Sequence, residues 1–245
     1  MLSALPGAMF GEVTAGEGPP IVALHGWGRT HRDFDRFRSL APLAGRHIVA
    51  VDLPGFGATP APRTAVGARA YAEMLVPLVA SLGSPVVLCG HSRGGAIALC
   101  LASAHPELVR GVVCTGAPLL RPATAAKPAL SYRLVRTATK AHLIPPTILE
   151  RRRQQSGSAD YRAATGVMRE VLVTMVNESY DDELRRLSVP LHLVWGELDN
   201  AVAVGVADAV RALVPTATLE VLPGVGHDTV RDAPEVLARV VGSIQ

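Results

Sequence analysis

The residues that most directly suggest chemistry are Ser92 and its neighbours in the run Gly90-His91-Ser92-Arg93-Gly94-Gly95. An apolar, strand-like segment (86–89) leads into this run, and a helix-compatible stretch (96–104) follows it. A G-x-S-x-G sequence between a strand and a helix predicts a strained turn that exposes the serine hydroxyl and needs nearly side-chain-free neighbours. The first amides of the helix then face the atom under attack, so we expect a nucleophile with anion stabilisation beside it.

The main alternative for this glycine-rich turn is a phosphate-binding loop. No Lys-Ser or Lys-Thr pair follows the glycines, and no G-x-G-x-x-G run with an acidic residue after the next strand is present. Neither phosphate-binding pattern therefore fits, and the nucleophile interpretation is favoured.

A serine nucleophile requires a base, and His227 is the best placed of the eight histidines. It alone follows the last predicted strand, in a loop bounded by glycines (223–228), whereas most of the others start, end or lie inside predicted strands and helices. His142 falls in a predicted insertion and is a candidate substrate contact only. We therefore expect His227 to be the general base.

The acid that orients this base is predicted to be Asp199. It follows the preceding strand (191–195), where a carboxylate reaches the distal nitrogen of the imidazole. The other position for such an acid, after the strand at 111–115, reads Gly116-Ala117-Pro118 and has no carboxylate. Glu197 is the local rival, and Asp228 is too near His227 in sequence to orient it.

An oxyanion hole needs two N–H donors where negative charge develops. We expect one to be the backbone amide of Arg93 and the second to be that of Trp27, in the loop His25-Gly26-Trp27-Gly28 after an early strand. For the ring of His25 we expect hydrogen bonds that hold this loop rather than a catalytic role. No histidines or cysteines share a metal-ligand spacing, so no metal and no cofactor are predicted.

The elements that position these residues alternate between strand and helix. Residues 9–14 and 21–24 predict an opening hairpin, Thr30-x-x-Asp33 predicts a helix that reaches about residue 40, and residues 65–82 predict a helix that Pro77 kinks or shortens. Further strand and helix signals alternate through 47–51, 86–115 and 191–241. We therefore expect an α/β fold, with a mostly parallel twisted sheet, helices on both faces, and catalytic loops at the carboxyl ends of the strands.

Residues 118–190 differ in character from the rest of the chain. Strand signals disappear, prolines cluster, and helical patterns appear at about 129–141 and 161–176. We predict a core of residues 1–117 and 191–245 with a helical lid inserted at 118–190. Met168, Leu172 and Met175, with Val171, fall on one apolar helix face that either packs on the core or lines a pocket for an apolar acyl group.

Composition excludes several classes of protein. At 245 residues and 49% hydrophobic content the chain can bury a full core, yet no apolar run approaches the length of a membrane span and no signal peptide is indicated. The three cysteines, Cys89, Cys100 and Cys114, are expected to be buried thiols. The net charge is only +3, and the basic run at 151–153 lacks interleaved aromatic residues, so no nucleic-acid partner is predicted. Without a signal peptide or a membrane span, we expect a cytoplasmic enzyme.

Taken together, these motifs resemble the α/β-hydrolase fold superfamily. The resemblance rests on His25-Gly26-Trp27-Gly28, Asp52-Leu53-Pro54-Gly55-Phe56-Gly57, the Ser92 run, Gly196-x-x-Asp199 and Gly226-His227, in the family's order of nucleophile, acid and base. Within this superfamily, the sequence is similar in particular to small serine carboxylesterases of the pimeloyl carrier-protein methyl ester esterase type. The resemblance implies a triad of Ser92, Asp199 and His227 and an oxyanion hole at Trp27 and Arg93.

The predicted function is therefore hydrolysis of a small or medium-chain carboxylic ester. Thioester or lactone hydrolysis, carbon–carbon bond cleavage or lyase chemistry, and a small-molecule receptor on the same fold remain as alternatives, because the motif residues are common to all of them. Relatives often carry Met, Leu, Gln or Phe after the nucleophile. Arg93 therefore stands out, either as a ligand for a substrate carboxylate or as a structural partner of groups beside the turn.

Overall fold

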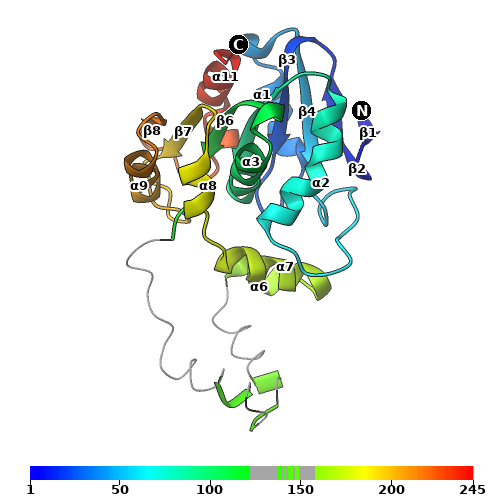
Figure 1. Ribbon diagram of the computed structural model, residues 1–245, viewed down its shortest axis with the longest axis vertical. Helices are drawn as coiled ribbons and strands as arrows, with labels where there is room; N and C mark the ends of the chain where they lie inside the picture. Colours follow the sequence, from blue (N-terminus) through cyan, green and yellow to red (C-terminus); the bar gives the residue numbers. More distant parts are fainter. Residues whose placement is uncertain (122–136, 140, 142, 146, 149–157, 245) are drawn as a thin grey trace.

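The computed structural model describes residues 1–121, 137–139, 141, 143–145, 147–148 and 158–244 (Figure 1). A single eight-stranded sheet in the order β1-β2-β4-β3-β5-β6-β7-β8 forms its centre. The strands are β1 (Leu2–Leu5), β2 (Met9–Thr14), β3 (Glu17–Leu24), β4 (Arg46–Asp52), β5 (Val86–His91), β6 (Val109–Thr115), β7 (Leu191–Gly196) and β8 (Thr218–Leu222). From β4 to β8 across the sheet all pairings are parallel, which confirms the predicted fold class.

Helices cover both faces of this sheet (Figure 1). The α-helices are α1 (Asp35–Arg38), α2 (Ala68–Ser81), α3 (Arg93–Ala104), α6 (Ala159–Ala163), α7 (Gly166–Asn177), α8 (Asp181–Arg186), α9 (Gly205–Leu213), α10 (Thr229–Asp232) and α11 (Pro234–Gly242). Short 3-10 turns occupy His31–Phe34, Ala41–Leu43 and Pro106–Leu108.

Two apolar layers follow from strict alternation along the central strands. In β3, Val22 and Leu24 face the layer beneath α2, α3, α8 and α9, whereas Ile21 and Ala23 face the layer beneath α1, α10 and α11. Because successive side chains of a strand point to opposite faces, a continuously apolar strand is the signature of a sheet buried on both sides. The loops that carry the predicted site residues are thereby fixed to a rigid support.

The opening of the chain differs from the predicted hairpin, and that prediction was wrong. β2 pairs antiparallel with β1 and with β4, and β4 lies between β2 and β3. The turn that makes a hairpin is the earlier one, since Gly7 and Ala8 both adopt positive φ, at 80° and 58°, as tight turns between antiparallel strands require. The strand signal of residues 2–5 was too short and too near the terminus to stand out.

Two predicted helices also differ in detail. After Thr30 a 3-10 turn precedes the four-residue α1, and the Asp33 carboxylate binds Arg29 in place of completing a capping box. α2 continues through Pro77 to Ser81 without interruption. Within 118–190 the described residues form α6, α7 and α8 and no strand, while the helix predicted near 129–141 and the basic run at 151–153 fall largely or wholly outside the described residues.

Candidate active site

The turn that carries Ser92 has the strained backbone that its sequence predicts. Ser92 lies between β5 and α3 with φ 52° and ψ −117°, a conformation that side-chain-bearing residues rarely adopt. The flanking glycines are obligatory because a Cβ on Gly90 would lie 2.5 Å from the Gly94 carbonyl oxygen, and one on Gly94 would lie 2.2 Å from that of Leu24. The Ser92 amide donates to the Thr115 carbonyl at 2.8 Å, which ties the turn to β6.

Asp199 and His227 meet through a direct hydrogen bond. The Nδ1 atom of His227 lies 2.8 Å from Oδ2 of Asp199, whose side chain is fully buried. Since an ionised carboxylate can only accept, Nδ1 carries the proton and Nε2 is left free to take another. The loops after β7 and β8 thus bring together the residues that the sequence predicts as acid and base.

Several further contacts hold the Asp199 carboxylate in its ionised form. Its Oδ1 atom accepts from the amides of Ala201, at 2.9 Å, and Val202, at 2.8 Å. Burial by itself raises the pKa of Asp199, but the hydrogen bonds from His227 and these amides outweigh burial and hold its pKa below the usual value. The indole of Trp195, at the end of β7, donates to the Val202 carbonyl at 2.8 Å and fixes the loop in turn.

The two rival carboxylates have other partners. Glu197 accepts from the amide of Gly224 at 3.1 Å, and Asp228 pairs with the guanidinium of Arg29 at 3.0 Å. Arg29 also binds Asp33 at 2.7 Å, so it links the loop after β3 to the loop that carries His227.

The loop after β3 passes directly over the strained turn. A Cβ on Gly26 would lie 3.3 Å from Cβ of Ser92, so this loop reaches van der Waals distance of the nucleophile only because residue 26 is glycine. The ring of Trp27 packs edge-on against Phe56, with ring centroids 4.9 Å apart. The Trp27 amide, a predicted oxyanion donor, belongs to this closely held segment.

The ring of His25 holds this loop, as predicted. Its Nε2 accepts from the amide of Leu53 at 3.0 Å, and its Nδ1 donates to the Gly26 carbonyl at 2.7 Å. Burial lowers the pKa of His25 to about 4, so the ring stays neutral and both of its nitrogens serve the loop.

His91 is a functional candidate that the sequence did not single out beyond its place in the motif. Its Nε2 donates to the backbone carbonyl of His227 at 2.9 Å, and the two ring centroids are 4.9 Å apart. The side chain is buried, and its Nδ1 atom faces Gly26 without a hydrogen-bond partner. His91 therefore lies between Gly26, in the loop after β3, and the backbone of His227, the predicted base.

Comparison with known proteins agrees with this architecture. A family model described as "Alpha/beta hydrolase family" matches residues 21–240, which include Ser92, Asp199 and His227. The chain belongs to the alpha/beta hydrolase family.

Relatives of this alpha/beta hydrolase include enzymes whose names state an activity. It is 28% identical to the pimeloyl-[acyl-carrier protein] methyl ester esterase of Yersinia enterocolitica, over 92% of this chain and 93% of that protein. It is 26% identical to the 2-hydroxy-6-oxo-6-(2'-aminophenyl)hexa-2,4-dienoic acid hydrolase of Metapseudomonas resinovorans, over 91% and 83%. Among solved structures, an esterase from Exiguobacterium antarcticum superposes with a TM-score of 0.73 at 20% identity, covering 99% of this chain and 98% of that one, which is a likeness of fold.

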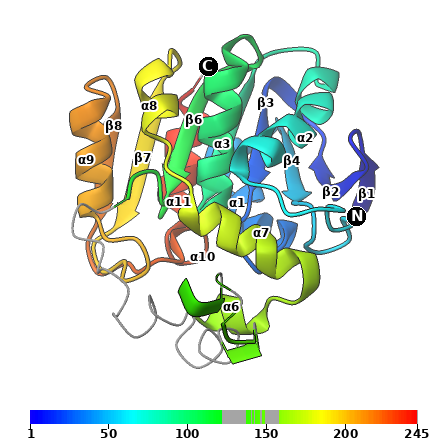
Figure 2. The same cartoon turned by 60° about the horizontal axis from the view of Figure 1, so that its bottom comes forward.

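In this alpha/beta hydrolase, α7 lies across one end of the sheet (Figures 1 and 2). Met168 packs against Gly55 in the loop after β4, since a Cβ on Gly55 would lie 2.3 Å from the Met168 sulfur. Leu172 and Met175 are buried, and Met175 joins the main apolar core. The guanidinium of Arg93 donates to the Met175 carbonyl at 3.2 Å, so its observed partner belongs to α7.

The part of the chain that the structure describes contains no group of three or more His, Cys, Asp or Glu side chains suited to a metal ion, and none of its helices is long and apolar enough to cross a membrane.

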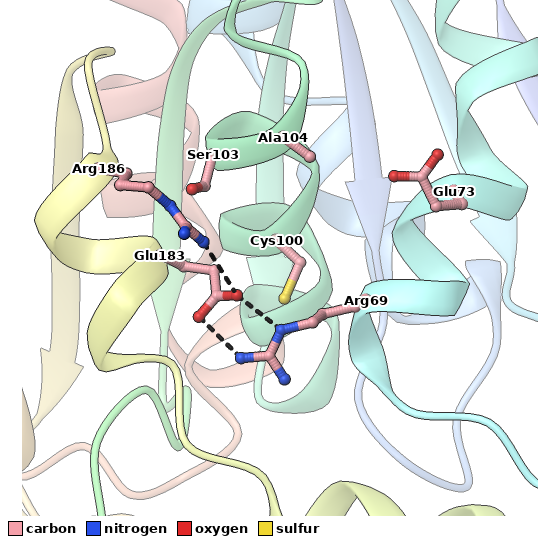
Figure 3. Close-up of a pocket in the computed structure, with 7 residues that line it drawn as sticks. All are labelled: Arg69, Glu73, Cys100, Ser103, Ala104, Glu183 and Arg186. Carbon is pink, nitrogen blue, oxygen red and sulfur yellow. Dashed lines mark hydrogen bonds and ion pairs between the residues drawn. The ribbon is translucent and has the colours of Figure 1, made fainter.

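A surface pocket of about 300 Å³ lies between α2, α3 and α8, and Ser92 is not among the residues that line it (Figure 3). Arg69 binds both oxygens of Glu183 there, at 2.6 and 2.9 Å, and Arg186 pairs with the same carboxylate. These charges satisfy one another and anchor α8 to the core.

Proposed function

We propose that this alpha/beta hydrolase is a serine esterase that cleaves a small or medium-chain carboxylic ester through an acyl-enzyme. The observation that carries the proposal is the 2.8 Å bond between His227 and Asp199. This pair lies against Gly116, the residue after Thr115, whose carbonyl binds the amide of Ser92 in its strained strand-to-helix turn. The strained turn costs free energy in an ordinary loop, and a histidine oriented by a buried carboxylate is the base that a serine hydroxyl needs to become nucleophilic.

In the proposed mechanism the Ser92 oxygen attacks the ester carbonyl carbon while Nε2 of His227 takes the hydroxyl proton. The charge on the former carbonyl oxygen is stabilised by the amides of Trp27 and Arg93. His227 then delivers its proton to the departing alcohol, which leaves the acyl group on Ser92. A water molecule gives a proton to His227 and attacks the acyl carbon, and collapse of this second intermediate releases the acid and restores Ser92.

Asp199 acts on the base rather than on the substrate. Its carboxylate accepts the Nδ1 proton of His227, which keeps Nε2 available, and it stabilises the imidazolium that forms after proton transfer. The two backbone amides on its other oxygen keep it ionised and oriented.

Substitution of Ser92 tests the mechanism. Purified wild-type protein and Ser92→Ala are assayed on p-nitrophenyl acetate, butyrate and octanoate, and both are exposed to a fluorophosphonate probe. We expect wild-type turnover, labelling of Ser92, and a loss of at least a thousandfold in kcat for the variant. An undiminished rate for Ser92→Ala would refute the serine mechanism.

The alternatives use the same groups, and an assay panel extended to thioesters, lactones and vinylogous diketones separates them. If the wild-type protein cleaves only thioesters, lactones or vinylogous diketones, the proposed ester substrate is replaced by that class of compound. Labelling of Ser92 without turnover of any of these compounds would favour a small-molecule receptor on this fold.

A further inference from the structure

Arg93 connects the nucleophile turn to the lid helix α7. It is the first residue of α3, immediately after Ser92, and its guanidinium donates to the carbonyl of Met175 near the carboxyl end of α7. The Met175 carbonyl also accepts from the amide of Glu178 at 3.3 Å. The last carbonyls of a helix carry partial negative charge, so they bind a cation favourably. A single residue thus places its amide at the predicted oxyanion hole and its side chain on the lid.

Tyr180 and Glu178 complete the environment of this guanidinium. Tyr180 is fully buried and contacts Arg93, and burial raises the pKa of its phenol, so the hydroxyl keeps its proton. The hydroxyl donates to Glu178 at 3.0 Å and leaves its lone pairs to Arg93. Glu178 in turn accepts from the amide of Ala68 at 2.8 Å, at the first turn of α2.

This cluster fixes one end of α7, and an apolar contact fixes the other. Near the amino end of α7, Met168 fills the space beside Gly55, a residue whose φ of +89° and lack of side chain admit the sulfur. Between the two anchors lies the buried side chain of Leu172, on the apolar face of the helix. Arg93 is thus one of the groups that hold the carboxyl end of this helix.

We infer that Arg93 is a positioning residue that sets the distance of α7 from Ser92 and thereby determines acyl-chain preference. The inference rests on the proposed esterase function. It assigns the guanidinium to the lid rather than to a substrate carboxylate, because its observed partners are the Met175 carbonyl and Tyr180. Acyl chains long enough to reach the α7 face gain contacts there, whereas an acetyl group is too short to do so.

The test compares Arg93→Met with Arg121→Met. Arg121 is exposed and donates to the Asn177 carbonyl at the same end of α7, so it is a matched arginine that does not adjoin the nucleophile. For each protein, kcat/KM is measured on p-nitrophenyl acetate and octanoate and on a half-ester with a free distal carboxylate. Hydrogen–deuterium exchange is followed for the peptide that spans residues 166–177.

For Arg93→Met we expect the octanoate-to-acetate ratio of kcat/KM to fall at least tenfold, mainly through KM, and exchange in residues 166–177 to accelerate. Arg121→Met should leave the ratio within about twofold of wild type, since water replaces an exposed hydrogen bond at little cost. Arg93→Lys, which retains the charge and a donor, should recover part of the ratio.

Three results would overturn the inference: an unchanged ratio with unchanged exchange, an equal fall in Arg121→Met, or a loss restricted to the half-ester. If Arg93→Met does not fold, Tyr180→Phe carries the same prediction, with a ratio at least threefold lower, and an unchanged ratio again counts against the inference. Absence of wild-type ester turnover would remove the proposed function, while the exchange measurement would still decide whether Arg93 holds α7.

Discussion

The imidazole of His91 and the backbone carbonyl of His227 are joined by a 2.9 Å hydrogen bond. Because a carbonyl can only accept, Nε2 of His91 carries the proton. Burial, followed by repulsion from His227, lowers the pKa of His91 to about 4, so the ring is neutral at physiological pH. The backbone of the proposed base is thus held by a neutral donor, which does not repel the positive charge that His227 gains when it takes a proton.

We predict that the donor, rather than the imidazole ring, is what His91 contributes. His91→Leu removes the bond to His227 and should lower kcat about tenfold, equivalent to about 1.4 kcal/mol. His91→Gln keeps an N–H at a similar distance from the backbone and should stay within about threefold of wild type. Steady-state kinetics on a single ester measure both, and equal losses in the two variants would contradict a positioning role.

The identity of the acid leads to a second prediction. Asp199→Asn presents an amide to Nδ1 of His227 and favours the wrong tautomer, so kcat should fall by about a thousandfold or more. Glu197→Gln serves as the control. The observed partner of that exposed carboxylate is the amide of Gly224, not His227. Its kcat should stay within about twofold of wild type. A larger loss in Glu197→Gln than in Asp199→Asn would exchange the two roles.

Gly116 gives a third prediction, based on space. A Cβ at this position would lie 2.9 Å from Nδ1 of His227 and 3.1 Å from Oδ2 of Asp199, so Gly116→Ala should separate the pair and lower kcat at least about a hundredfold. Gly83 is a matched control, with φ +74° and open space around its Cβ position, against φ +55° at Gly116.

Comparison of the two variants separates backbone strain from the steric effect. Gly83→Ala should lose stability, measured by urea unfolding, and retain its rate. If both variants lose activity equally, strain alone accounts for the effect at Gly116 and the steric explanation is wrong.

The buried imidazoles of His25 and His91 predict a dependence of stability on pH. Each has a pKa of about 4 in the folded protein against an ordinary value of 6.5, so the unfolded chain binds more protons between these limits. The stabilisation is complete above pH 6.5 and is lost as the pH falls toward 4. Between pH 7 and 5 each imidazole should remove about 2 kcal/mol from the free energy of unfolding.

Urea unfolding at pH 7, 6 and 5 measures this slope. His25→Asn should reduce it, whereas His47→Asn, at a partly exposed position in β4, should leave it unchanged. The lowered pKa of Asp199 comes instead from hydrogen bonds to its ionised form. Its contribution to stability is lost only when the pH falls below the ordinary carboxyl range, outside this window. A slope that His25→Asn does not change would argue against neutral burial of that ring.

Much of the site could be predicted because its residues follow strands whose order is fixed by the sheet. Asp199 was inferred partly because Gly116 lacks a carboxylate, and the structure supplies the reason, since the space beside Gly116 is taken by the His227–Asp199 pair. The contact of Arg93 with Met175 and that of His91 with His227 span 82 and 136 residues, and nothing local in the sequence marks either one. Such contacts depend on packing between elements rather than on propensity or spacing.

The position of β8 at one edge of the sheet has a consequence for the newly made protein. Ser92 and its turn are complete once β5, β6 and α3 have folded, but His227 follows β8, which comes last along the chain among the strands that the structure describes. Domains fold as their segments emerge, so a growing chain holds Ser92 without its proposed base until β8 pairs with β7. We therefore expect nascent chains that stop before β8 to be inert toward cellular esters, so that hydrolysis begins only when synthesis of the fold is finished.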